Sequence, residues 1–285
     1  MQPLFDTDLL LARKLRAVRS GVDGADFLMV RVAEDLAERL ATVERKFARA
    51  IAAFCTTNDA ARVLMDSGKV GSVIRVERDP AFLDSGEGIV APAEVLPIEP
   101  ESVDLAVSLL AFQEINDLPG LLYQFRRVLK PDGLLLAAMA GGETLKELRE
   151  CLLIAETELT GGAAPRVAPF TDVRDAGALL QRAGFALPVA DIEVITVRYP
   201  HLFALMTDLR AMGATNALVD RSRRPVSRRL FARAAEIYAE RFADPDGRIR
   251  ATFSIVWLSG WAPDASQPKP LKPGSAQVSL TKVLK

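Results

Sequence analysis

The side chains that most often carry metal or nucleophilic chemistry are scarce in this chain of 285 residues. It contains one histidine, His201, and two cysteines, Cys55 and Cys151. A single histidine excludes an iron site of two histidines and one carboxylate within one chain. A zinc site is disfavoured because the two cysteines lie far apart in the sequence. No G-x-S-x-G turn supports a serine–histidine–aspartate triad. We therefore predict no metal site.

Two adjacent glycines, Gly141 and Gly142, are the residues most like a phosphate-binding loop. They lack the lysine and the spacing of such a loop. Glycine lets the backbone turn tightly and approach its neighbours closely. The pair therefore predicts a tight turn with close backbone packing.

The elements that must position any active site follow the pattern of a parallel α/β sheet. Residues 103–110 form an apolar run of strand length, as expected of a strand buried on both faces. A helix then begins near residues 116–119, with Asn116 or Asp117 as its cap and Pro119 in the first turn. After a turn at 130–133, a second apolar strand follows at 134–139. Together they predict a βαβ unit with a right-handed crossover.

Strand and helix signals alternate along the rest of the chain. We predict further strands at 48–54, 72–77, 88–91, 190–198 and 252–261. We predict further helices at 9–19, 31–47, 59–67, 143–159, 172–183, 200–212 and 225–242.

The order of these signals resembles a class I S-adenosylmethionine (SAM) methyltransferase domain. Residues 130–133, which read KPDG, match the K-P-x-G turn of that fold. A narrower likeness is carried in order by 116–119 (NDLP), 141–149 (GGETLKELR), 169–171 (PFT) and 208–216 (DLRAMGATN). These segments resemble the family of mitochondrial complex I assembly factors known as protein-arginine hydroxylases, with their bacterial relatives. The malonyl-carrier-protein methyltransferases of biotin synthesis are a more distant likeness.

The resemblance covers nearly the whole chain and implies its domain organisation. It implies a doubly wound α/β fold of seven mostly parallel strands, with the last strand antiparallel beside the fifth. Residues 1–47 would supply N-terminal helices, 48–262 the methyltransferase-like domain, and 263–285 a proline-rich tail. The helical segments at 143–170 and 200–242 exceed the minimal fold. We expect them to form a cap over the carboxyl ends of the strands, where open α/β sheets bind ligands.

The resemblance also places a SAM loop directly after the first strand. Members of the superfamily carry an acidic residue there, followed by G-x-G-x-G, because glycine permits positive φ and leaves space for the ligand. The aligned positions hold Ala52 in place of the acid, and Phe54, Thr56 and Asn58 in place of the glycines. Of these only Asn58 readily adopts a left-handed conformation. Phe54 is expected to project its ring into or beside the cofactor channel, so we expect a degraded loop and weak or absent SAM binding.

The other cofactor positions implied by the resemblance are retained only in part. Glu77 ends the second predicted strand, where a carboxylate would accept hydrogen bonds from the ribose hydroxyls. The alternative is a solvated glutamate at a strand end. Pro92 stands where the superfamily has an aspartate near the adenine, with Glu94 two residues later. Gln113 and Glu114 stand where the narrower family has a His-Trp pair.

A substrate or partner cleft is expected beside the cap. The segments that carry the narrower resemblance lie outside the minimal cofactor site, so they should serve a partner or a substrate. The polar residues expected around this cleft are Gln113, Glu114, Glu143, Arg149, Arg210 and Asn216. The alternative is that the residues of the cap segments only cap and pair their own helices.

A local basic cluster accompanies the cap helices. Its residues are Arg221, Arg223, Arg224, Arg228, Arg229 and Arg233. The cluster is either a solvated helix face or a docking patch for an acidic protein partner or membrane headgroups.

The amino-acid composition limits the classes of partner and the cellular compartment that we expect for this protein. A formal net charge of −1 and an isoelectric point of about 6.0 give no general attraction to nucleic acid. Two cysteines fit a reducing cytoplasm. No apolar run reaches transmembrane length. The expected amphipathic helix at 9–19 leaves peripheral contact with an inner membrane open.

Three functions are consistent with these patterns. The first is a role in assembling respiratory complex I by binding one of its subunits, with or without retained arginine hydroxylation, as the narrower resemblance implies. The second is SAM-dependent methylation of a small acid or a protein side chain. The third is partner binding without catalysis.

Overall fold

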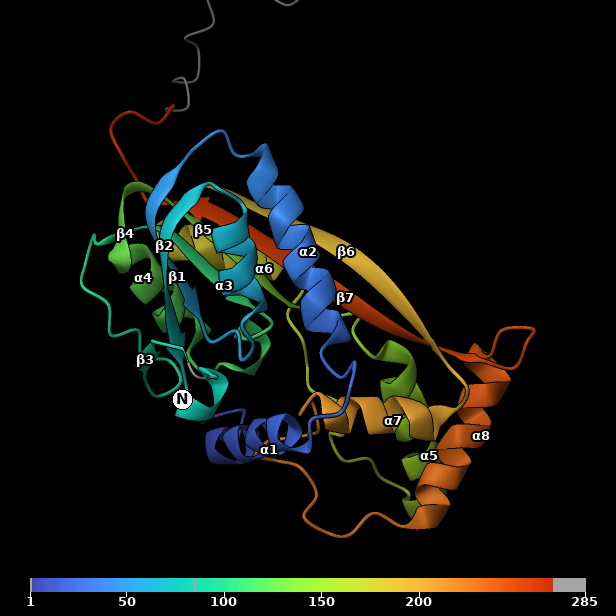
Figure 1. Cartoon of the computed structure of the whole chain (residues 1–285). Coiled ribbons are helices and arrows are strands. Elements are labelled where there is room, and N and C mark those ends of the chain that lie inside the picture. Colours follow the sequence, from blue (N-terminus) through green and yellow to red (C-terminus); the bar gives the residue numbers. More distant parts are fainter. Residues whose placement is uncertain (1, 85, 269–285) are drawn as a thin grey trace, which may run out of the picture.

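One sheet of seven strands organises residues 2–84 and 86–268, the part of the chain that the computed structural model describes (Figure 1). The strands are β1 (Phe47–Ala53), β2 (Val70–Glu77), β3 (Ile89–Val90), β4 (Val103–Leu109), β5 (Leu129–Ala140), β6 (Ala186–Tyr199) and β7 (Ile249–Trp261). Their spatial order is β3-β2-β1-β4-β5-β7-β6. The neighbours among the first five strands pair in parallel, and β7 is antiparallel to both β5 and β6. The predicted doubly wound α/β class and the antiparallel last strand are confirmed.

The helices begin and end close to the residues that the sequence indicates. They are α1 (Thr7–Ser20), α2 (Phe27–Thr42), α3 (Asp59–Asp66), α4 (Leu118–Val128), α5 (Lys146–Thr160), α6 (Val173–Arg182), α7 (Leu202–Ala211) and α8 (Arg228–Phe242), with 3-10 turns η1 (Pro80–Phe82) and η2 (Phe112–Glu114). Asp117 is the cap of α4, because its carboxylate accepts a hydrogen bond of 2.9 Å from the Gly120 N–H. His201 caps α7, with its ring Nδ1 3.1 Å from the Ala204 N–H.

The predicted helix at 31–47 was wrong at both ends. Helix α2 starts at Phe27 and stops at Thr42, and Phe47 is the first residue of β1. Phe47 lies seven residues after Leu40 and so extends the apolar period of the helix by coincidence. Phe47 is instead buried at the start of β1. Its backbone N–H donates a hydrogen bond of 2.7 Å to the Lys69 carbonyl. Of the expected tail, residues 269–285 lie outside the described residues.

Helices cover both faces of the sheet. One face packs against the apolar sides of α4 and α6 through residues such as Phe125 and Leu180. The opposite face packs against α2 and α3 through residues such as Leu36 and Leu64. Strand β4 is therefore buried on both sides, as its unbroken apolar run predicts.

A separate apolar core joins α5, α7 and α8 to the ends of β6 and β7 that extend beyond the rest of the sheet (Figure 1). Leu148, Leu205 and Ile237 from the three helices meet Tyr199 and Phe253 from the two strands. We call α5, α7 and α8 the cap helices. Helix α1 contacts α7. Phe5, just before the helix, and Leu10 within it form a small apolar cluster with Ala217 and Leu218. This arrangement places α1 and the cap helices around one end of the parallel strands.

Candidate functional site

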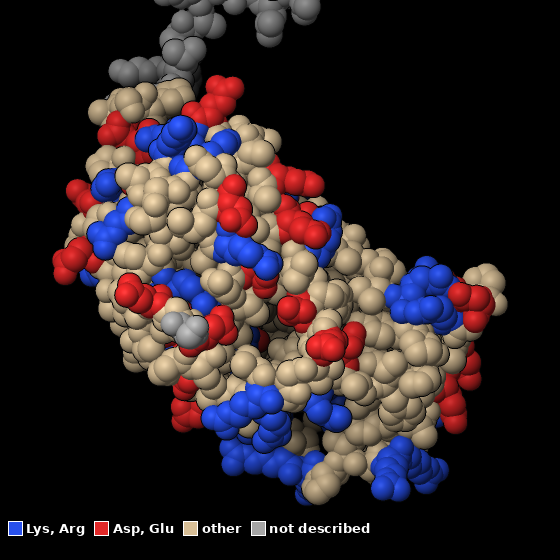
Figure 2. All heavy atoms as spheres, viewed as in Figure 1, with Lys and Arg blue, Asp and Glu red and all other residues tan. Residues whose placement is uncertain are grey.

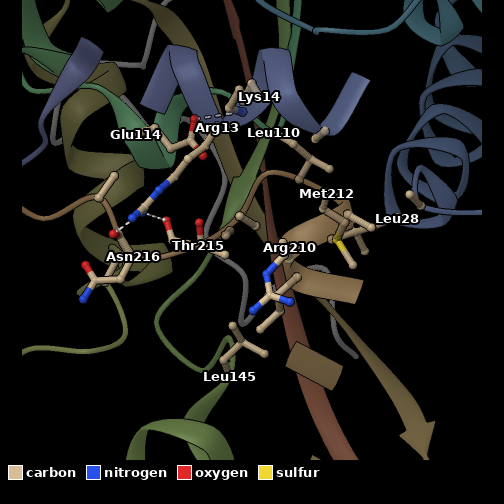
Figure 3. A pocket seen from close by; sticks show the side chains of 18 of the residues that line it. Arg13, Lys14, Leu28, Leu110, Glu114, Leu145, Arg210, Met212, Thr215 and Asn216 are labelled. Carbon is tan, nitrogen blue, oxygen red and sulfur yellow. Dashed lines mark hydrogen bonds and ion pairs between the residues drawn. The ribbon is translucent and has the colours of Figure 1, made fainter. Parts of the chain in front are cut away.

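A cavity of about 760 Å³ lies at the carboxyl ends of β1, β4 and β5 (Figure 3). Thr56 and Thr57 line it after β1, and Leu110, Gln113 and Glu114 line it after β4. Helix α1, the segment 21–26, helices α5 and α7, the segment 166–170 and strand β7 supply most of the remaining wall. Ligands of open α/β sheets bind outside the carboxyl ends of the strands, and this is where the cavity lies.

The loop after β1 keeps two left-handed residues although it has no glycine. Phe54 has φ 60° and Thr56 has φ 65°, whereas Asn58 has φ −83° and stands exposed before α3. The left-handed positions are thus the first two of the three aligned with glycines, not the asparagine that the sequence favours. Each costs roughly 1–2 kcal/mol for a residue with a side chain. Neighbours hold them: the Phe54 N–H donates to the Val76 carbonyl at 2.7 Å.

Phe54 does not enter the cavity. Its side chain is 3% exposed and belongs to the core under the sheet, together with Val76, Ala91 and Phe112. Ala52, aligned with the missing acid, is a buried β1 residue and brings no polar group to the loop. The ring that we expected in the channel is therefore part of the packing that fixes the loop.

Glu77 is buried beneath the loop instead of facing the cavity or solvent. It is 1% exposed, and its two carboxylate oxygens accept from the Thr56 N–H at 3.1 and 3.2 Å. The Arg75 guanidinium lies 3.5 Å away. Burial raises the pKa of Glu77 to about 7, although Arg75 and the Thr56 hydrogen bond oppose the rise. Glu77 is therefore not among the residues that line the cavity, and its carboxylate is directed at the backbone of the loop after β1.

Glu94 and Pro92 stand away from the cavity lining. The Glu94 carboxylate accepts from the Asn116 N–H at 2.6 Å. The Asn116 side-chain oxygen in turn accepts from the N–H groups of Leu4 and Phe5, each at 2.8 Å. Glu94 therefore supports the segment that leads into α1, while Pro92 is exposed.

Gln113 and Glu114 are the predicted residues that the structure brings to the cavity wall after β4. The Gln113 amide donates to the Leu110 carbonyl at 2.6 Å and accepts from the Ala140 N–H at 3.3 Å, which ties β4 to β5. Glu114 forms an ion pair of 2.8 Å with Lys14 of α1. Both side chains of that pair are 13% exposed.

Glu143 and Arg149 do not line the cavity. Glu143 is exposed and pairs with Lys146 at 3.0 Å on its own helix turn. The Arg149 guanidinium lies near the carbonyls of Gly142, Thr144 and Ala168, at 3.2–3.4 Å. It therefore holds the turn at 141–144 against the segment before α6.

Arg210 and Asn216 line the cavity with different roles. Arg210 is exposed, and among the described residues it has no ion-pair partner. The Asn216 side chain donates to the Pro165 carbonyl at 2.7 Å and accepts from the Leu218 N–H at 3.0 Å. Asn216 thus shapes the chain around the cavity, whereas Arg210 is available to a ligand.

The sequence did not indicate that α1 forms a wall of this site. The Arg13 guanidinium donates to the carbonyls of Thr215, at 2.8 Å, and Asn216 (Figure 3). Gly213 has φ 73°, and a Cβ there would lie 3.1 Å from the Lys14 Cα. The pair Met212-Gly213 was the available signal, because a glycine after a helix can mark close backbone approach.

The basic cluster of 221–233 is only partly paired. Arg221 pairs with Asp6 at 3.0 Å and Arg233 with Glu158 at 2.7 Å. The other four, Arg223, Arg224, Arg228 and Arg229, are exposed. Figure 2 shows Lys and Arg gathered along the lower edge of the molecule, over α1 and the start of α8.

The described residues 2–84 and 86–268 contain neither a candidate metal-binding group nor a helix that could span a membrane. Within these ranges no three His, Cys, Asp or Glu side chains are grouped as metal ligands would be. No helix in the same ranges has the length and apolar character to cross a membrane.

Comparison with known proteins gives the family. Residues 53–137 match the model of a methyltransferase domain. The arginine-hydroxylase NDUFAF5 of Mus musculus is 38% identical over 99% of this chain and 84% of its own length. The Danio rerio protein of that name is 45% identical over 69% of this chain, and the match spans 61% of its length. A malonyl-[acyl-carrier protein] O-methyltransferase of a Methylovorus species is 32% identical over 85% of each chain.

A solved structure supports the fold independently. A Bacillus halodurans protein described as a candidate methyltransferase superposes with a TM-score of 0.56 at 14% identity, over 81% of this chain and 98% of its own. The strand order and this likeness identify the class I methyltransferase fold, whose family implies SAM binding. Because 38% of residues are identical over 99% of its length, the chain belongs to the family of the mitochondrial arginine-hydroxylase NDUFAF5.

Proposed function

We propose that this chain acts on an arginine side chain of a protein partner during the assembly of respiratory complex I. The observation that carries the proposal is the position of Glu114. Its side chain is only 13% exposed and lies in the wall of a cavity that is largely apolar. Leu28, Leu110 and Leu145 are among its apolar lining residues. Such walls suit the aliphatic stem of an arginine, and a carboxylate suits its guanidinium. The names of the relatives, arginine-hydroxylase, agree with this chemistry.

SAM-dependent methylation is the second candidate. The left-handed conformations at Phe54 and Thr56 favour it, because they preserve the backbone course that a glycine loop gives. The placement of Glu77 favours the first proposal, since its carboxylate is closed off by Thr56 and Arg75. We therefore propose that the SAM site is degraded and that no step of the reaction depends on it.

SAM is expected to bind this protein much more weakly than micromolar, or not at all. The reason is that Glu77, the carboxylate at the end of β2, is engaged by Thr56 and Arg75, and that Thr56 places a side chain where the loop would approach the ligand. Calorimetric titration of the purified protein with SAM measures this directly. A micromolar dissociation constant, about −8 kcal/mol, would restore the methyltransferase candidate.

Deletion of the gene is expected to deplete assembled complex I in the source cell, and the wild-type chain should restore it. Arg210→Ala should restore it poorly, because Arg210 is the exposed cation at the cavity and has no structural partner among the described residues. Glu143→Ala is the matched control, since Glu143 is exposed but outside the cavity. Native gels quantify the complex, and thermal melting verifies that each variant folds.

Normal complex I in the deletion strain would refute the proposed function. Equal restoration by Arg210→Ala and Glu143→Ala would remove Arg210 from the site but leave the assembly role intact.

A further inference from the structure

We infer that Lys14 is an internal stand-in for the substrate: it occupies the cation-binding position at Glu114, and the partner's arginine must displace it. This inference rests on the proposed function, because that function supplies the arginine. It adds a named binding residue, Glu114, and a form of self-inhibition in which α1 keeps the site filled.

The ion pair has the geometry of an occupied subsite. Lys14 of α1 lies beside Glu114, the last residue of η2, and the charged atoms are 2.8 Å apart (Figure 3). Both side chains line the cavity and both are largely buried. The Lys14 charge also opposes the rise in the pKa of Glu77.

The other cations of the cavity have partners of their own or lie in the open. Arg13 is bound to the carbonyls of Thr215 and Asn216. Arg166 is held by Glu156 in an ion pair of 2.5 Å. Arg210 is exposed. Among the described residues, Lys14 is therefore the cation that Glu114 binds, and its removal would leave this carboxylate free for a ligand.

Helix α1 is attached in a way that permits exchange. The cluster beneath it has four buried residues, Phe5, Leu10, Ala217 and Leu218. Partly buried Leu9 and Ala168 add to this small cluster. The other named anchors are polar: Asp6 with Arg221, Arg13 with two carbonyls, and Asn116 with residues 4 and 5. Segments with few buried apolar contacts open at lower free energy than a core does.

An arginine is the better ligand for Glu114 once α1 moves. A guanidinium can donate two parallel hydrogen bonds to one carboxylate, whereas an ammonium acts as a point charge. Asp23 and Asp26 are exposed on the segment 21–26 that lines the cavity, and they would attract a cationic side chain. The same geometry disfavours a glutamate ligand, because Glu114 would repel it.

Binding of a blocked arginine to the full-length protein tests the inference. The probe is N-acetyl-L-arginine methylamide, titrated by calorimetry or NMR into the wild type, Lys14→Gln, Glu114→Gln and the double variant. Lys14→Gln should bind the arginine probe about tenfold more tightly than the wild type does, because Lys14 no longer competes with the probe for Glu114. Glu114→Gln and the double variant should lose binding, and Glu143→Gln should behave as the wild type.

Two further binding measurements test the roles of the charge and of helix α1. The citrulline analogue has the same shape without the charge and should bind no variant. Gly213→Ala leaves Lys14 and Glu114 intact but crowds α1 at Lys14, so it should also raise the affinity for the arginine probe.

Equal affinities of Lys14→Gln and wild type, or binding to none of the variants, would overturn the inference. Binding of citrulline as tight as that of arginine would do the same. Tighter binding of a blocked glutamate to the wild type, lost in Lys14→Gln, would make Lys14 an anion receptor instead. These measurements use purified protein, so they can fail while the complementation of complex I succeeds.

Discussion

Glu77→Gln is expected to be more stable than the wild type by about 3 kcal/mol above pH 8, and equal to it near pH 4. Folding raises the pKa of Glu77 from 4.5 to about 7, mainly by burial. Each pKa unit corresponds to about 1.4 kcal/mol. The folded protein therefore binds one more proton than the unfolded chain between these two values, and the free energy of unfolding falls as pH rises through that window.

Glutamine removes the titration while keeping the shape and an acceptor for the Thr56 N–H. Denaturant unfolding of both proteins at pH 4 to 8.5 gives the free energy of unfolding of each. Groups that titrate alike in the two proteins cancel in the difference between these free energies. Parallel curves for the two proteins would show that Glu77 is ionised throughout, and a variant that is less stable at every pH would assign the carboxylate to charge pairing with Arg75.

Glu147→Ala is expected to destabilise the protein by about 3 kcal/mol, the cost of leaving two buried donors without an acceptor. Glu147 is 5% exposed on α5, and its carboxylate accepts from both the N–H, at 3.1 Å, and the hydroxyl of Thr252 on β7. These bonds tie a cap helix to the sheet. Chemical denaturation at pH 7 measures the loss.

Glu143→Ala, four residues earlier, is the matched control. Its carboxylate is exposed and makes one ion pair with Lys146, so its loss should change stability by less than about 0.5 kcal/mol. If the two variants were equally stable, the Glu147 bonds would carry no net free energy. A large loss for Glu143→Ala would show that the turn at 141–144 depends on its charge.

The sheet could be predicted from the sequence because buried parallel strands leave a strong local signal. The run at 103–110 is apolar without interruption, and the structure buries it on both faces. Topology then fixed the neighbourhood of the site: Gln113 and Glu114 follow β4, so they had to lie near the loop after β1. The prediction that the helix ends at residue 47 was wrong. Phe47 lies seven residues after Leu40, a spacing that suits one face of a helix, but it is the first residue of β1.

The rest depended on contacts between distant segments. Residue preferences favoured Asn58 for a left-handed conformation, but hydrogen bonds to β2 impose it on Phe54 and Thr56. Packing on Gly213 and the ion pair with Glu114 place Lys14, and these partners lie about 200 and 100 residues away in the chain. No local pattern encodes such pairings.

The long ladder of β6 and β7 determines how this molecule can move. Strand β7 pairs with β5 from Ile255 to Trp261, and with β6 along its whole length from Ile249. The cap core is thus built on the same two strands that close the sheet, with no linker between them. A hinge between cap and sheet would have to break this ladder, so the two behave as one rigid body. Under the proposed function, exchange at the cavity falls to α1 and the segment 21–26 that line it, and the rate of ligand exchange should follow how fast these two segments open.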